Sequence, residues 1–141
     1  MSIKMLLDAR KHPARDAAIH SIKCIEKKDR AGWLSMWDEH SLLEDPVGKS
    51  PLDPEGNGHQ GIEKITAFYD NIIAPSTLRF QIRHTYAGGN ECANVGTITV
   101  KGAEGYVSRT ELVMVYKVND AGKVVSLRAF WEFDDMMAGV F

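Results

Sequence analysis

Residues 78–86 read LRFQIRHTY, and this stretch carries the clearest indication of the fold. Every second residue of it shares one face of an extended chain, and Phe80 and Ile82 make that face apolar. Arginine and glutamine occupy the opposite face, which is typical of a strand that covers a core on one side. The residues Gly-Gly-Asn at 88–90 then turn the chain.

Three further strands are expected after this turn. Residues 95–100 and 110–118 are rich in β-branched side chains, and residues 123–133 end the series. Glycine and asparagine in the segments 101–105 and 119–122 supply the intervening turns. Strands joined by such short turns run antiparallel.

Helices are expected before this sheet. A long amphipathic helix follows Pro13 and ends near Lys28, and Asp29 is placed to cap a second, short helix. A third helix covers residues 62–73 and is stopped by Pro75. The apolar side of the second helix is predicted to carry Trp33, Leu34 and Trp37.

Helices followed by a run of strands predict an α+β fold, with helices packed on one face of a curved, mainly antiparallel sheet. The chain of 141 residues has the length of one domain, and residues 1–141 are taken as such. Residues 42–44 form a short strand before the sheet proper. The segment 45–61 is rich in proline and glycine and is expected to be a loop, whose length is typical of a functional lid or rim.

Composition excludes several classes of protein. Lys+Arg number 17 and Asp+Glu number 19, so the net charge of -2 argues against a nucleic-acid partner. No stretch approaches the length of a membrane span. Cys24 and Cys92 lack metal or redox spacing and indicate thiols in a reducing, cytoplasmic location. The histidines are scattered, so neither a metal site nor another cofactor is predicted.

The sequence Glu44-Asp45-Pro46 holds the principal candidate for chemistry. Proline keeps the preceding residue out of helical geometry, so Asp45 extends the strand and shares the face of Leu43. A carboxylate that faces an apolar interior has a raised pKa and is suited to moving protons. A solvated Asp-Pro turn is the alternative interpretation.

The stretch Leu43-Glu44-Asp45-Pro46-Val47-Gly48 resembles the signature around the catalytic aspartate of Δ5-3-ketosteroid isomerases. Further blocks at 61–69 and 121–131 match in order and spacing, and so do Asp29 and Trp33 upstream. The resemblance implies the cone-shaped α+β barrel shared by ketosteroid isomerase, scytalone dehydratase, SnoaL-type cyclases and nuclear transport factor 2.

In these isomerases an aspartate removes a proton beside the steroid carbonyl and returns it two carbons along, while two donors stabilise the oxyanion. The resemblance places this base at Asp45. It also places the apolar pocket at Trp37, Phe68, Tyr69, Leu127 and Trp131.

The two oxyanion donors of the family are absent. Ser21 stands where these isomerases have tyrosine and Met114 where they have aspartic acid, so Met114 is expected only to contact the substrate. The chain is most similar to members that lack both donors. Tyr116, on the same strand face as Met114, is the first candidate replacement. Ser21 acting through a water molecule is the second, and a tryptophan indole is the third.

Three functions therefore stand as hypotheses. The first is an isomerase that acts on a flat apolar ketone, a 3-oxo steroid in the first instance. The second is a SnoaL-like cyclase or dehydratase acting on another ketone, and the third is a steroid or lipid carrier without catalysis. A homodimer is implied by the family, in which the exposed sheet face commonly pairs. The sheet residues are apolar on both alternations in places, notably at Val113, Val115 and Val124 beside Val125. Met136 and Met137 are expected to close the pocket or to contact a second chain.

Overall fold

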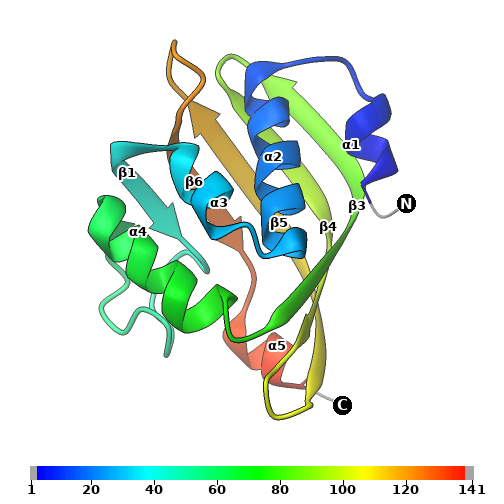
Figure 1. Cartoon of the computed structure of the whole chain (residues 1–141). Helices are drawn as coiled ribbons and strands as arrows, with labels where there is room; N and C mark the ends of the chain where they lie inside the picture. The colour runs from blue at the N-terminus through cyan, green and yellow to red at the C-terminus, as the bar shows by residue number, and fades with distance from the viewer. Residues whose placement is uncertain (1–2, 139–141) are drawn as a thin grey trace.

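The computed structural model describes residues 3–138 and contains short helices packed on one six-stranded sheet (Figure 1). The helices are α1 (Lys4–Asp8), α2 (Pro13–Lys27), α3 (Arg30–Ser35), α4 (Ile62–Phe68), which continues as π-helical turns (Tyr69–Ile73), and α5 (Phe133–Ala138). The strands are β1 (Trp37–Glu44), β2 (His59–Gln60), β3 (Thr77–Gly88), β4 (Glu91–Lys101), β5 (Val107–Val118) and β6 (Val124–Phe130).

The strands are arranged in the order β2-β1-β6-β5-β4-β3. All neighbours are antiparallel except β1 and β6, which run parallel. This confirms the α+β cone with a mainly antiparallel sheet. The sheet does not close into the expected barrel, because β2 and β3 are its two edges.

The long strands form where the sequence alternates. Along β5, the residues Leu112, Met114 and Tyr116 are buried, and each is followed by a more exposed neighbour. Phe80 and Ile82 are likewise buried on β3, as the alternation from residue 78 predicts. A bulge between Ile82 and His84 then reverses the two faces of the strand, so Tyr86, expected on the inner face, is 64% exposed. The inner face of the sheet is therefore apolar and requires a cover.

Helix α2 supplies that cover and packs against β3, β4 and β5 (Figure 1). It begins at Pro13, whose missing N–H costs nothing at a helix start, and the ring of His12 accepts a bond from the Ala14 N–H. It ends at Lys27, and the next residue, Lys28, adopts the left-handed conformation common at helix ends (φ 59°). Asp29 caps α3 as predicted, accepting a bond from the Gly32 N–H.

The second helix is shorter than predicted, because it ends at Ser35 and does not include Trp37. The carbonyl of Met36 accepts a bond from the Val124 N–H, and this pairing draws Trp37 into β1. Tertiary hydrogen bonding thus overrides the helical spacing of the tryptophans.

Other boundaries also differ from the sequence-based expectation. The predicted loop 45–61 includes β2, which pairs with β1, and the last strand ends at Phe130 rather than 133. Helices α1 and α5 were not predicted from the sequence. Met136 is described by the structure, whereas the side chain of Met137 lies outside the described residues.

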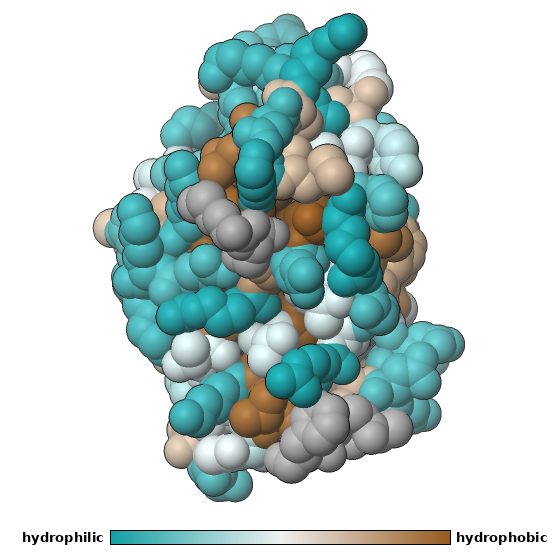
Figure 2. Space-filling view, turned by 90° about the vertical axis from the view of Figure 1, so that its right-hand side faces the viewer, coloured by the Kyte–Doolittle hydropathy of each residue, from teal (hydrophilic) through white to brown (hydrophobic). Residues whose placement is uncertain are grey.

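The buried apolar side chains form one connected core that includes residues from Ile3 to Ala129. On one side of the molecule, hydrophilic residues surround smaller hydrophobic areas (Figure 2). Within residues 3–138, no helix has the length and apolar character needed to cross a membrane.

Candidate active site

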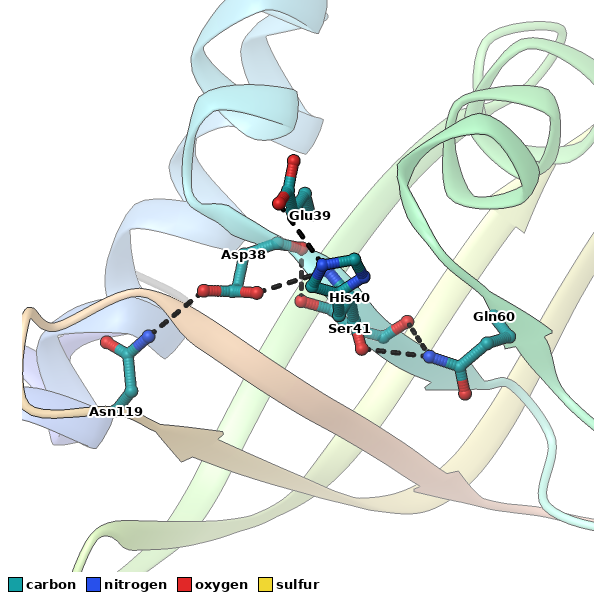
Figure 3. Close-up of polar contacts among 6 residues, drawn as sticks. All are labelled: Asp38, Glu39, His40, Ser41, Gln60 and Asn119. Carbon is teal, nitrogen blue, oxygen red and sulfur yellow. Dashed lines mark hydrogen bonds and ion pairs between the residues drawn. The ribbon is translucent and has the colours of Figure 1, made fainter.

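Polar contacts at the start of β1 join this strand to Gln60 of β2 and to Asn119 (Figure 3). The pairing of β1 with β6 is irregular between Trp37 and Leu42. Ser41 lies in this irregular stretch, is fully buried, and donates to the carbonyl of Val124 at 2.6 Å. Gln60 of β2 donates to the Ser41 carbonyl at 3.2 Å, which ties the edge strand to the same point. After this anchor the pairing is regular, and the strand leads directly to Asp45.

Asp45 lies just past the end of β1, and Trp131 lies just past the end of its parallel neighbour β6. The Trp131 indole N–H donates to the Asp45 carboxylate at 2.6 Å. Burial raises the pKa of Asp45 from its ordinary value to about 6, although the bond from Trp131 acts in the opposite direction. The carboxylate can therefore be both ionised and protonated near neutral pH, which suits a group that accepts and returns a proton.

The Asp45 side chain forms part of the wall of a cavity of about 500 Å³. This volume lies in the range of small-molecule sites. The wall is mainly apolar and is built by the loop after β1, the end of α4 with its π-helical turns, the sheet and α5. Its apolar members include Leu52, Phe68, Ile72, Ile73, Leu78, Ile98, Val100, Leu112, Trp131, Phe133 and Met136.

The predicted site residues divide into two groups in the structure. Asp45, Phe68 and Trp131 line the cavity together. The other six are buried in the core and are not among the residues that line it: Ser21, Trp37, Tyr69, Met114, Tyr116 and Leu127.

Tyr116 and Ser21, the candidate oxyanion donors, are bonded to each other. The Tyr116 hydroxyl donates to Ser21 Oγ at 2.9 Å, and the Trp33 indole N–H donates to the same oxygen at 3.0 Å. Burial raises the pKa of the Tyr116 phenol, so it stays protonated. Tyr116 does share the inward face of Met114, as the alternation predicts, but its proton is directed to Ser21.

The third candidate oxyanion donor is a tryptophan indole, and the two tryptophans of the predicted pocket, Trp131 and Trp37, differ in their polar contacts. Trp131 donates its N–H to Asp45 and so does not offer it to a ligand oxygen in this structure. The Trp37 N–H is buried and has no hydrogen-bond partner among residues 3–138. The Trp37 ring packs edge-on against Trp33, with ring centroids 5.3 Å apart.

Sequence reasoning missed Thr110, a polar residue of the cavity wall. Thr110 is only 5% exposed, and its hydroxyl is buried without a hydrogen-bond partner in the described part of the chain. The sequence did contain a signal for this residue. Met114 and Tyr116 belong to an alternation of inward-facing residues along β5, and the same alternation includes Leu112 and Thr110.

No group of three or more histidine, cysteine, aspartate or glutamate residues within 3–138 is arranged to hold a metal ion. His20 and Cys24 are in contact, with Cys24 Sγ 3.5 Å from His20 Nε2. Burial and the nearby Asp29 raise the pKa of the Cys24 thiol, which disfavours the nucleophilic thiolate form.

The fold and the site together define an NTF2-like α+β cone with the carboxylate of Asp45 in the wall of a mainly apolar cavity. The model of the SnoaL-like domain family matches residues 18–127, and the chain belongs to this family. Among proteins with curated descriptions, none matches the chain in sequence.

Solved structures of mycobacterial proteins are similar over nearly the whole chain. RV0760c from Mycobacterium tuberculosis is 30% identical with a TM-score of 0.85, and the match covers 95% of this chain and 98% of that one. The Δ5-3-ketosteroid isomerase from Mycobacterium sp. is 30% identical with a TM-score of 0.84, covering 93% and 98%. RV0760c in complex with estradiol-17β-hemisuccinate is 31% identical with a TM-score of 0.84, covering 93% and 99%.

Proposed function

We propose that the protein binds a neutral, flat, apolar ketone in its cavity and that Asp45 moves a proton within this ligand, as in a steroid Δ-isomerase. The observation that carries the proposal is a carboxylate with a pKa of about 6 on the wall of a mainly apolar cavity. The similarity to a ketosteroid isomerase and to a steroid complex supports a 3-oxo steroid as the first substrate to test.

The proposed reaction is a proton shuttle without net gain or loss. Ionised Asp45 removes a proton from the carbon between the carbonyl and the 5,6 double bond, which gives a dienolate. Protonated Asp45 then returns that proton to carbon 6, so the double bond becomes conjugated with the carbonyl. Trp131 holds the carboxylate in place throughout and, by stabilising its charged form, keeps it available as a base.

Conversion of 5-androstene-3,17-dione to the conjugated 4-ene product tests this proposal, because the product absorbs ultraviolet light. Wild-type protein should accelerate the conversion, and Asp45→Asn should abolish the acceleration. Asn119→Ala, which alters a residue at the opposite end of β1 and β6, is the control and should retain the wild-type rate. A wild-type rate equal to that in buffer would eliminate isomerisation of this steroid.

A second candidate is a non-catalytic steroid or lipid carrier, and the pairing of Tyr116 with Ser21 favours it. Their hydroxyl groups bond to each other, and neither residue lines the cavity that holds Asp45. Loss of an oxyanion donor lowers rates on the order of 100- to 1000-fold, so binding can persist where turnover does not. A steroid that raises the melting temperature without being converted would support the carrier.

The third candidate is a SnoaL-like cyclase or dehydratase, in which Asp45 removes a proton from a different apolar ketone. Such chemistry needs the base and the cavity but can rely on polar groups of the substrate itself. Screening non-steroidal ketones for Asp45-dependent turnover separates it from the isomerase, since the steroid assay alone would not detect it.

We further propose that the protein forms a homodimer through the outer face of its sheet. Val95, Val113 and Val115 are partly exposed there, and adjacent Phe130 is 42% exposed with the Arg128 guanidinium 5.2 Å from its ring centroid. Light scattering coupled to size-exclusion chromatography should give twice the chain mass. A monomer mass, or an undiminished dimer after Val113→Lys, would contradict this surface.

A further inference from the structure

The hairpin between β4 and β5 brings the ring of Tyr106 to the mouth of the cavity. Tyr106 directly precedes β5 and continues the two-residue period of its inward-facing residues. It belongs to the cavity wall and is 42% exposed, and Ile72 of the same wall is 36% exposed. Phe68 and Leu112, which also line the cavity, are buried. The first two residues therefore lie at the mouth of the cavity and the last two in its interior.

Gly102 holds the Tyr106 ring in its place. The Gly102 N–H donates to the Tyr106 carbonyl at 2.9 Å, so the two residues close the hairpin. The ring packs directly over Gly102, because a Cβ atom there would lie 2.7 Å from Tyr106 Cδ1 and closer still to Cε1 and Cζ. Gly105 of the same hairpin has a φ of 92°, whereas Gly102 has no positive φ. Glycine at position 102 is therefore required by the ring and not by the turn.

Strand pairing places Tyr106 at the end of the cavity away from Asp45. Trp131, which donates to Asp45, follows Phe130, and Phe130 pairs with Val113 of β5. Tyr106 precedes Val113 by seven residues, which corresponds to roughly 23 Å of extended backbone. Asp45 and Tyr106 nevertheless line the same cavity, which their side chains approach from its two ends. A ligand whose reacting carbon lies at Asp45 can reach Tyr106 only with its opposite end.

We propose that Tyr106, positioned by Gly102, packs its ring against the end of the ligand that lies farthest from Asp45. The inference rests on the proposed binding of flat, apolar ligands in this cavity. A ligand that extends to the mouth covers ring surface that is exposed in the free protein, and burial of apolar surface favours binding. Tyr106 is then a ligand-binding residue, and Gly102 is the residue that positions it.

Chemical protection of the wild-type protein tests the contact directly. Tetranitromethane nitrates accessible tyrosines: Tyr106 and Tyr86 are exposed, whereas Tyr69 and Tyr116 are buried. Saturating androst-4-ene-3,17-dione should slow the nitration of Tyr106 several-fold. The nitration of Tyr86, which does not line the cavity, should stay unchanged. Mass spectrometry of the peptides measures each rate, and an equal rate at Tyr106 with and without bound steroid would overturn the contact.

Variants connect the contact to the ring and to the glycine beneath it. Tyr106→Phe keeps the ring and should bind the steroid as the wild type does, whereas Tyr106→Ala should bind it about tenfold more weakly. Gly102→Ala displaces the ring and should also weaken binding. In the Tyr106→Ala background it should have no further effect, because no ring remains to be displaced. Tryptophan fluorescence can follow binding, since Trp131 is part of the cavity wall.

Gly88→Ala is the matched control for the glycine substitution. Gly88 also has no positive φ, a Cβ atom there would meet nothing within 4 Å, and the residue lies at the end of β3, outside the cavity wall. This variant should therefore retain the wild-type affinity. If Gly102→Ala weakened binding as much without the Tyr106 ring as with it, the positioning role of Gly102 would be overturned.

The outcomes separate this inference from the function on which it rests. If the steroid changes neither the tryptophan fluorescence nor the melting temperature of the wild-type protein, steroid binding and the Tyr106 contact are both overturned. If the steroid binds but leaves Tyr106 unprotected, or if Tyr106→Ala binds it with wild-type affinity, the contact alone is overturned and steroid binding stands. The protection experiment uses only wild-type protein, so it decides the matter even where a variant fails to fold.

Discussion

The indole N–H of Trp131 lies 2.6 Å from the carboxylate of Asp45, and this bond joins two residues that each follow the end of a parallel strand. Burial raises the pKa of that carboxylate, and the indole partly offsets the increase. The pair therefore determines at which pH the proposed base becomes ionised, and its effect on the pKa can be measured directly.

Trp131→Phe should raise the pKa of Asp45 above its wild-type value of about 6, because a hydrogen bond that favours the ionised form is lost while burial remains. Carbon-13 NMR of the labelled carboxyl carbon, followed over pH, measures this change. Trp37→Phe serves as the control for the same titration, since the Trp37 N–H has no partner in residues 3–138. An unchanged or lowered pKa in Trp131→Phe would show that the indole does not stabilise the carboxylate.

Asp45→Asn should stabilise the protein at neutral pH. With a folded pKa of about 6 against an ordinary 3.8, the native state binds more protons than the unfolded state between these values. Wild-type stability should therefore fall as pH rises through this window, by up to about 3 kcal/mol, and stay at the lower level above it. Urea unfolding across pH 3.5 to 7.5 checks the sign.

The Asn variant cannot ionise and should lack this decrease. Asp120→Asn, on an exposed turn, should retain the wild-type decrease. Two results together would contradict a buried carboxyl group: a wild-type free energy of unfolding that rises between pH 4 and 6, and the same pH profile in Asp45→Asn.

Substitutions of Ser21 and of Tyr116, which donates a hydrogen bond to it, should have strongly coupled effects on the free energy of unfolding. Ser21→Ala leaves the Tyr116 hydroxyl and the Trp33 indole buried without their acceptor, so it should destabilise the fold by about 2–5 kcal/mol. Tyr116→Phe removes one of these donors and should cost much less in the Ser21→Ala background than in the wild type. Urea unfolding of the four proteins measures the coupling, and strictly additive costs would contradict the bond.

Thr110→Val should raise the free energy of unfolding, by about 1 kcal/mol, because it removes a buried hydroxyl that has no partner in the described chain. Ser108→Ala should act in the same direction for the same reason. Scanning calorimetry without ligand measures both. A lower melting temperature for Thr110→Val would show that its hydroxyl is already satisfied within the folded protein.

Much of the fold could be predicted from the sequence because two periodicities dominate it. The alternation at 78–82 and along β5 determines which residues face inward, and Tyr116 does share the face of Met114. The bulge between Ile82 and His84, which turns Tyr86 outward, was not predicted. Asp45 could be selected because the strand leads toward a proline and because of its resemblance to a catalytic signature. Local pattern was sufficient for the buried strand faces, whereas the choice of Asp45 depended on the resemblance.

The remaining features depend on which elements meet in three dimensions. Trp37 fits a helical pattern with Trp33, yet the bond from Val124 to Met36 places it in a strand. No spacing along the chain shows that Tyr116 meets Ser21, since these residues are 95 positions apart. Sequence could name the polar candidates for the site, but only the packing of helix on sheet shows which hydroxyl groups are satisfied by the protein.

The position of β6 in the sheet has a consequence for how the molecule is assembled. It is the last strand within residues 3–138, yet it lies between β1 and β5 rather than at an edge. Until it is in place, the β1–β2 ribbon and the β3–β4–β5 meander share no strand pairing, and Asp45 lacks both a neighbouring strand and the indole from 86 residues downstream. Long-range pairing of this kind slows folding. Removal of the chain from residue 124 onward would therefore take away both the strand that joins the two parts of the sheet and the indole that bonds to Asp45.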